Sequence, residues 1–454
     1  MNNSEITHLC QQAENEYSAF LNELQKLEVA EYPTSASQDF IRELRNEANF
    51  QKKQLTQKRK AASGSPGQLG SVKLEIHAIK AIRANLISNL MVYLDWVSGA
   101  QTRKVPWSFI PSAEDLAQRI IPKRKVILYC ENQYNYRIVW CENPNPVKRF
   151  QQYCFVSLPR LHRTNILMHV WIGHELFHPL CKKFTEEKKR KAGENIANTV
   201  REVFKDLKKP RREIAHLNDL LMIAWERALQ EILCDIALGK IFGPAGLLAM
   251  RSFASFSDRR GKLGPETQFY PPWQYRFEVV WQRGINKEAL KTLLEDVGEA
   301  GKDFQDEITE FGKTLKSNEG AQYVTQYSFY KIAYTEVNNL LSEAAEFVDS
   351  KLPKDLPKWS DDNILNQVHK LVDRLLNGLP PNEIPNYTYN SKKLKGSYAP
   401  EPAGVPAILT AGWIYESFRE RAQGRGQKDV LDHASLSRLL LKACEDSEML
   451  KSCR

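Results

Sequence analysis

"WIGHELFHPL", residues 171–180, carries two histidines four positions apart and a glutamate directly after the first. On a helix, residues four apart share one face, so His174 and His178 could both reach one tetrahedral metal ion. Glu175 lies about 100° further round the helix, where it would face a metal-bound water that needs a base and would not bind the ion itself. The alternative is an ordinary pair of half-buried histidines packed under Trp171.

Short strands precede this histidine helix. The segments "KVILYC" (125–130) and "YNYRIVW" (134–140) are β-branched and aromatic and are separated by a short turn, which predicts a hairpin. "YCFVSLP" (153–159) predicts a third strand, which Pro159 ends. The histidine helix would follow and would end or kink at Pro179. We therefore expect a helix-rich α+β fold with a small, mainly antiparallel sheet.

Helical periodicity dominates the rest of the chain. The predicted helices cover residues 5–28, 37–60, 73–97, 188–209, 213–239, 286–316, 324–350, 361–377, 406–422 and 433–447. A Gly/Ser-rich stretch at 62–71 predicts a flexible linker, and a proline-rich stretch at 379–406 predicts a long loop that covers a site or a partner surface. The chain then divides into an N-terminal helical region (1–110), a core with the histidine helix (111–285) and a C-terminal helical domain (286–454).

The composition is that of an ordinary globular protein. The 454 residues are 42% hydrophobic and 26% charged, with a net charge of +9, and the length suggests two or three domains. The N-terminal "MNNSEITHLC" lacks a signal-peptide pattern and no long apolar run occurs, so we expect a cytoplasmic protein without a membrane span. Eight cysteines form no CxxC pair, which favours reduced thiols, and Cys234 is interpreted as buried and inert.

A zinc site needs a third protein ligand, and the chain offers one on a later helix. In one class of zinc enzymes the motif continues as HExxHxxGxxH, but here Cys181 and Phe184 occupy the glycine and last histidine positions. "QEILCD" (230–235) supplies a glutamate instead. Glu231 and Asp235 are four apart and share a face. Asp235 falls within an apolar stripe, where a carboxylate is costly unless it is paired or bound.

Together, "HELFH" and "QEILCD" resemble the gluzincin metallopeptidases, the thermolysin-like group, over about residues 120–285. The resemblance implies a zincin-like core and an intracellular zinc-dependent endopeptidase that hydrolyses peptide bonds in a restricted protein substrate. It implies that one Zn²⁺ ion per chain would bind to His174, His178 and Glu231. Glu175 would be the general base, and Asp235 would accept the N–H of His174 and so fix its tautomer.

Two further segments extend the resemblance. The strand at 153–159 resembles the edge strand on which such enzymes align an extended substrate. "YPPWQYRFEVV" (270–280) resembles a segment in which some intracellular gluzincin-like proteins carry His-Pro-Pro and an arginine. Tyr270 takes the histidine position and Arg276 follows, so either side chain would stabilise a developing oxyanion. The aromatic residues of this segment could equally be core side chains.

A basic segment, defined here as residues 182–212, contains twelve lysines and arginines against five acidic residues. It could bind nucleic acid or another polyanion, with contacts at Lys188, Lys189 and Arg190, or it could be a solvated helix face.

The sequence thus supports two hypotheses on function. The first is a zinc endopeptidase acting on a protein or peptide. The second is a non-catalytic helical scaffold with a structural or degenerate metal site that binds a polyanion. The oligomeric state stays open.

Overall fold

A computed structural model describes most of the chain and divides it into two compact units. The described residues are 3–63, 72–140, 148–203, 205, 211–258, 270–318, 330–384, 387–390, 395–398, 401–427 and 430–452. Unit 1 comprises Met1–Ile110 and Pro122–Arg163, and unit 2 comprises Pro111–Ile121 and Thr164–Arg454. This division differs from the predicted boundaries, because the sheet groups with the N-terminal helices and the histidine helix groups with the C-terminal helices. Residues 64–71 of the predicted linker lie outside the described part.

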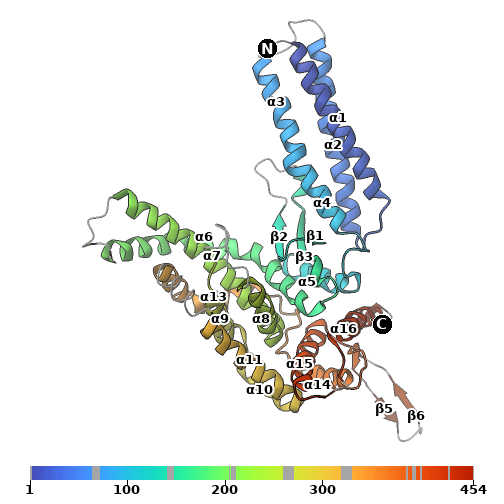
Figure 1. The fold of residues 1–454 in the computed structure, drawn as a ribbon, viewed down its shortest axis with the longest axis vertical. Helices are drawn as coiled ribbons and strands as arrows, with labels where there is room; N and C mark the ends of the chain where they lie inside the picture. Colours follow the sequence, from blue (N-terminus) through green and yellow to red (C-terminus); the bar gives the residue numbers. More distant parts are fainter. Residues whose placement is uncertain are drawn as a thin grey trace. The chain divides into compact units, whose positions relative to one another are not determined.

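Long helices that share an apolar core build most of unit 1 (Figure 1). They are α1 (Asn3–Glu28), α2 (Ser35–Ser63), α3 (Val72–Asn85), a π-helical turn (Leu86–Leu90) and α4 (Met91–Gly99). Their apolar stripes face one another, as helical periodicity requires. Phe40 of α2 lies at the centre of an aromatic cluster, with ring centroids 5.6 Å from Tyr93 and 4.9 Å from Phe155. This cluster joins the helices to the sheet of the same unit.

The sheet of unit 1 differs from the predicted hairpin. Strands β1 (Lys125–Glu131) and β2 (Arg137–Trp140) both pair with β3 (Tyr153–Pro159), which lies between them. β1 runs parallel to β3 and β2 runs antiparallel to it. The predicted hairpin, the mainly antiparallel sheet and the edge position of β3 are therefore wrong. The physical reason is burial: every residue of β3 is buried, as expected for a central strand covered on both faces.

Unit 2 is almost entirely helical. Helices α6 (Trp171–Val203) and α7 (Arg211–Phe242) pack along each other, which confirms their predicted pairing. Further helices are α5 (Ile110–Ile120), α8 (Pro244–Asp258), α9 (Trp273–Val279), α10 (Lys287–Val297), α11 (Glu299–Asn318), α13 (Leu341–Lys351), α14 (Asp362–Leu376), α15 (Val405–Gly424) and α16 (His433–Ser452). Residues 330–338 are also helical. The helix-rich character of the fold is thus confirmed, whereas the zincin-like core stays a prediction.

Helix α6 continues through Pro179. The predicted helix end at this proline is therefore wrong, and the helix predicted at 188–209 is not separate, because one helix of 33 residues runs from Trp171 to Val203. Residues 204 and 206–209 of that prediction lie outside the described part of the chain. Proline lacks the N–H that would bond to the carbonyl of Glu175, a defect that costs about 3 kcal/mol in an isolated helix. The turns on both sides of Pro179 bury apolar side chains such as Phe177 and Phe184. Packing therefore offsets the defect.

Two C-terminal predictions also need correction. The predicted helix at 286–316 is divided at Gly298, whose φ of 65° ends α10 before α11 begins. The predicted loop at 379–406 contains short antiparallel strands in its described residues. They are β4 (Glu383–Ile384) with β7 (Glu401–Pro402), and β5 (Tyr387–Asn390) with β6 (Lys395–Tyr398). Among the described helices, none combines the length and the apolar character that a bilayer span requires.

The junction after α7 provides a test of this packing. Gly243 follows α7 with a φ of 57°, and an added Cβ would overlap the indole ring of Trp359. We expect Gly243→Ala to lower the free energy of unfolding by about 2–5 kcal/mol, since positive φ costs alanine about 1–2 kcal/mol and overpacking adds about 1–3 kcal/mol. Gly378 is the matched control, because it follows α14 with a φ of 70° and has open space around it. Urea unfolding followed by circular dichroism should show a clearly smaller loss for Gly378→Ala; equal losses would contradict the proposed clash.

Candidate metal centre

Helices α6 and α7 bring the predicted site residues into one buried cluster. The Nε2 atom of His174 lies 3.4 Å from Glu231 Oε2, and the Nε2 atom of His178 lies 3.7 Å from Glu231 Oε1. The Nδ1 atom of His174 lies 3.0 Å from Asp235 Oδ1. The two imidazole rings share one face of α6, with centroids 4.9 Å apart. One carboxylate thus faces both imidazoles, which is the arrangement that a shared metal ion needs.

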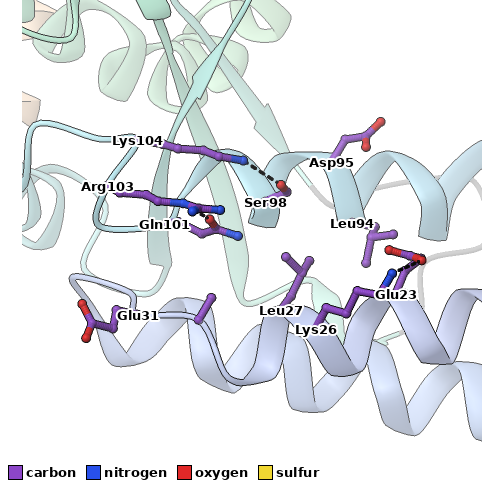
Figure 2. Close-up of a pocket in the computed structure, with 11 residues that line it drawn as sticks. Glu23, Lys26, Leu27, Glu31, Leu94, Asp95, Ser98, Gln101, Arg103 and Lys104 are labelled. Carbon is purple, nitrogen blue, oxygen red and sulfur yellow. Dashed lines mark hydrogen bonds and ion pairs between the residues drawn. The ribbon is translucent and has the colours of Figure 1, made fainter.

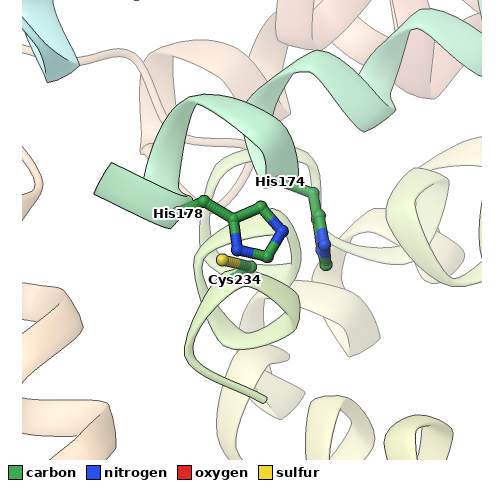
Figure 3. Close-up of side chains that lie close together, drawn as sticks. All are labelled: His174, His178 and Cys234. Atoms are coloured by element: carbon green, nitrogen blue, oxygen red, sulfur yellow. The ribbon is translucent and has the colours of Figure 1, made fainter. Parts of the chain in front are cut away.

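A buried group of side chains in this cluster could hold a metal ion. His174, His178 and Cys234 each offer one ligand atom, and these atoms all lie within 4.8 Å of one another (Figure 3). Two imidazole nitrogens and a sulfur are donors that zinc prefers, and Glu231 adds a carboxylate oxygen beside both imidazoles. The donor chemistry of the cluster therefore fits a zinc ion.

Cys234 is the residue that sequence interpretation missed as a candidate ligand. Its side chain is fully buried, and its sulfur lies 3.5 Å from the sulfur of Cys181, with both residues present as free thiols. Burial and the neighbouring Cys181 hold the pKa of Cys234 well above its usual range, so the thiol is protonated without a metal. Cys234 follows Glu231 by three positions, and residues three apart on a helix are neighbours. That spacing could have indicated Cys234 as a candidate ligand.

A buried arginine completes the cluster. Arg276 of α9 donates two hydrogen bonds to Asp235, from Nε at 2.7 Å and from Nη2 at 2.8 Å. The Nη2 atom also lies 3.1 Å from Glu231 Oε2, and the guanidinium stacks over Trp273 at 4.4 Å from the ring centroid. Arg276 is only 5% exposed. Its positive charge therefore compensates the two buried carboxylates. The stabilisation of an oxyanion by Arg276 stays a prediction.

The two histidines have opposite protonation behaviour. Burial acts to lower the pKa of His174, but Asp235 and Glu231 outweigh it and raise that pKa to about 10. Burial lowers the pKa of His178 to about 4, because the neighbouring charges compensate only in part. Burial also acts to raise the pKa of the Asp235 carboxyl, yet Arg276 and His174 hold it below its usual range. Without a metal, the cluster therefore balances anionic Glu231 and Asp235 against cationic Arg276 and His174.

Tyr270 and Tyr275 have different surroundings, although both lie in the segment predicted to supply an oxyanion donor. The nearby Glu231 carboxylate and burial raise the pKa of Tyr270 to about 12, so its hydroxyl is a neutral donor beside the cluster. Tyr275 instead packs as a core side chain: its ring stacks on Tyr334 at 5.3 Å and its hydroxyl donates to Asn338. The core interpretation therefore holds for Tyr275, and Tyr270 stays a candidate for the site.

Glu175 lies beside the histidines without bridging them. Its Oε2 atom is 3.9 Å from His178 Nε2, and the residue is 7% exposed. Glu231, by contrast, approaches both imidazoles. Glu175 thus contacts one of the two imidazoles and Glu231 contacts both; the roles of base and ligand stay predictions.

The basic segment has acidic neighbours where it is described. Lys188 bonds to Glu343 at 2.5 Å, and Lys189 bonds to Glu226 at 3.1 Å. Arg190 contacts Glu194 on the same helix at 3.4 Å. Each cation that was predicted to contact a polyanion thus already contacts a carboxylate. These contacts favour the interpretation as a solvated helix face; polyanion binding stays a prediction.

Comparisons with known proteins do not assign this chain to a family. No protein-family model matches it, and neither the curated proteins nor the solved structures include a significantly similar one. The interpretation of the site therefore depends on its own geometry and chemistry.

Metal binding can be tested directly on the histidine pair. We expect the purified chain to bind one Zn²⁺, and His178→Ala to weaken binding by more than the 10–100-fold that is typical of losing an outer-shell partner. His77→Ala, at an exposed position on α3, is the matched control and should leave zinc affinity unchanged. Elemental analysis gives the stoichiometry and a competitive chelator titration gives the affinity. Equal zinc affinity in both variants would remove His178 from the site.

The contact between Asp235 and Arg276 gives a second test. Asp235→Asn removes the carboxylate that accepts both hydrogen bonds of the buried guanidinium and leaves Glu231 as its one charged partner in this cluster. We therefore expect a loss of about 3–5 kcal/mol in the free energy of unfolding, together with a zinc affinity about 10–100-fold weaker. Asp303 offers a matched control, since it also accepts two hydrogen bonds from an arginine, but the Arg425 side chain is 41% exposed and its charge therefore stays in contact with water. Asp303→Asn should cost about 0–1 kcal/mol and leave zinc affinity unchanged. Comparable losses in the two variants would contradict the special role of the buried pair.

Proposed function

We propose that this chain is a zinc-dependent endopeptidase acting on a restricted protein or peptide substrate. The observation that carries the proposal is the single carboxylate of Glu231, which lies 3.4 Å from His174 and 3.7 Å from His178 in a buried cluster. Two imidazoles and one carboxylate are a ligand set of catalytic zinc sites that keep one coordination position open. His174, His178 and Glu231 would hold the ion.

The metal would supply one part of the chemistry. When bound, zinc would act as a Lewis acid that polarises a peptide carbonyl and makes a water molecule more acidic. Asp235 supports this ligand set, because its oxygen lies 3.0 Å from His174 Nδ1. A carboxylate at that nitrogen leaves Nε2 as the ligand atom and fixes the orientation of the ring.

Glu175 is the proposed general base. Its carboxylate lies beside His178 and is almost entirely buried. In that position it would accept a proton from the attacking water and pass it to the leaving amine of the peptide bond. The near-complete burial of the carboxylate keeps competing water away from this proton transfer.

Tyr270 and Arg276 take different proposed roles. Tyr270 keeps its proton at neutral pH and lies close enough to Glu231 for that carboxylate to raise its pKa, so it would donate a hydrogen bond to the developing oxyanion. Arg276 contacts Asp235 and Glu231 and is proposed to position these carboxylates for the histidines and the metal.

One observation favours a second function. The sulfur of Cys234 and one nitrogen of each histidine all lie within 4.8 Å of one another. A bound ion could therefore take two imidazoles, Glu231 and the Cys234 thiolate. Four protein ligands would leave no open position, as in structural zinc sites, and the chain would then be a non-catalytic scaffold. Cobalt substitution distinguishes the two cases, because a cobalt–thiolate bond gives an intense near-ultraviolet absorption band. Loss of that band in Cys234→Ser would assign the sulfur as a ligand.

The role of Glu175 gives the decisive test of catalysis. Glutamine is nearly the same size as glutamate but cannot accept the proton, so we expect Glu175→Gln to retain one zinc and to lose activity by about 10²–10⁴-fold. Activity would be measured by mass spectrometry on a cell-derived protein pool, comparing cleavage products of the wild type and the variant.

Three ligand variants complete this comparison. His178→Ala and Glu231→Ala should lose zinc as well as activity, whereas Cys234→Ser should retain both if the metal keeps an open position. Full activity in Glu175→Gln, or loss of zinc from it, would overturn the assigned role. Absence of any zinc-dependent cleavage, together with a cobalt–thiolate band, would favour the structural site.

A further inference from the structure

Unit 1 contains a basic cavity that the metal centre does not involve. The cavity has a volume of about 700 Å³, within the range of small-molecule sites. Its wall is built from the end of α4, the following loop, the end of β1 and the residues after β3. The residues that line it include Arg103, Lys104, Arg160 and Arg163. Four cationic side chains therefore converge on one cavity.

These cations lack acidic partners in the part of the chain that the structure describes. Arg103 bonds to the side-chain amide of Gln101, and Lys104 bonds to the hydroxyl of Ser98 at 2.9 Å, as Figure 2 shows. Among the described residues, no carboxylate contacts Arg103, Lys104, Arg160 or Arg163 within ion-pair distance. Burial, together with the charges of Arg103 and Arg160, lowers the pKa of Lys104. The positive charges thus repel one another, and a bound anion would relieve this repulsion.

Two acidic residues also line the cavity. Glu131 accepts a hydrogen bond from Arg137 on Oε2 at 2.7 Å, while its Oε1 atom is buried and has no hydrogen-bond partner among the described residues. Asp95 is exposed in the middle of α4 and lines both this cavity and a second one of about 590 Å³. Figure 2 shows Asp95, Arg103 and Lys104 around that second cavity. The positive potential therefore dominates, with one carboxylate at the rim that could accept a hydrogen bond from a ligand hydroxyl.

The position of the cavity in the sheet is typical of a ligand site. β1 and β3 are parallel, and the cavity is lined by Tyr129, Cys130 and Glu131 at the carboxyl end of β1 and by Arg160 and Arg163 beyond the carboxyl end of β3. Sheets with parallel strands bind ligands outside the carboxyl ends of those strands. The end of α4 packs closely against β1 in this wall, because an added Cβ on Gly99 would collide with the carbonyl of Cys130.

We propose that this cavity binds a small polyphosphate-bearing ligand, such as a nucleoside triphosphate, through Arg103, Lys104, Arg160 and Arg163. Arginine forks match phosphate oxygens in pairs, and lysine adds a point charge. A polyphosphate carries several negative charges in a short length, which suits four cations around one cavity. The aromatic side chains of Trp96 and Tyr129 in the same wall offer surface to a base.

The test is a binding titration on the full chain with the metal centre emptied by EDTA. The probes are ATP, inorganic triphosphate and AMP. Calorimetry measures the binding of each. We expect ATP and triphosphate to bind and AMP to bind at least about tenfold more weakly, since it has lost charge-assisted contacts. Tighter binding of ATP than of triphosphate would identify a nucleotide, and equal binding would identify an inorganic polyphosphate; either result supports the polyphosphate site.

Matched double variants assign the binding to the cavity. Arg160→Gln/Arg163→Gln should weaken ATP binding about 100-fold, or about tenfold for each lost contact. Lys53→Gln/Lys60→Gln removes the same charge from exposed positions of α2 and should leave binding unchanged. Lys104→Gln should weaken binding about tenfold and decides the matter if the first double variant fails to fold. His178→Ala should bind ATP normally, which separates this site from the metal centre.

Three outcomes would overturn the proposal. The first is the absence of saturable binding for both ATP and triphosphate. The second is an equal loss of affinity in the cavity variants and in the control at Lys53 and Lys60, because the effect would then come from net charge alone. The third is displacement of ATP by a single-stranded oligonucleotide that binds more tightly than ATP. The cations would then bind a nucleic acid and not a small ligand.

Discussion

Two buried carboxylates impose the strongest constraint on unit 2. Glu231 is 6% exposed and Asp235 is fully buried, and each would be prohibitively costly without a compensating charge. Arg276 and His174 supply that compensation from two other helices. The electrostatic requirement therefore fixes α6, α7 and α9 relative to one another. The same arrangement leaves both imidazoles facing one carboxylate.

Much of this cluster could be predicted from the sequence, because its spacing is local. The four-residue intervals from His174 to His178 and from Glu231 to Asp235 fix which side chains share a helix face. One long-range inference, that α6 packs on α7, is then enough to bring the histidines and the carboxylates together. The partner choice of Arg276 was not predictable in this way, since it depends on how α9 approaches α7. The closeness of Cys234 to the histidines likewise depends on how α6 and α7 pack together.

The sheet shows why other features could not be predicted. Local pattern indicates that 125–130, 134–140 and 153–159 are strands, but strand order depends on non-local pairing. The third strand inserts between the first two because its apolar residues need cover on both faces. Pro179 illustrates the opposite case. A strong local signal for a helix end is overridden there by the tertiary packing of the surrounding turns.

The chain crosses between its two compact units three times, near residues 110, 121 and 163. Helix α5 belongs to unit 2 but lies in the sequence between two parts of unit 1. A cut after residue 163 would therefore leave α5 attached to unit 1 and would deprive unit 2 of one of its helices. Neither unit can be excised, duplicated or exchanged as a single contiguous piece of gene. The metal centre and the basic cavity each belong to a unit that no single uninterrupted segment of the chain forms on its own.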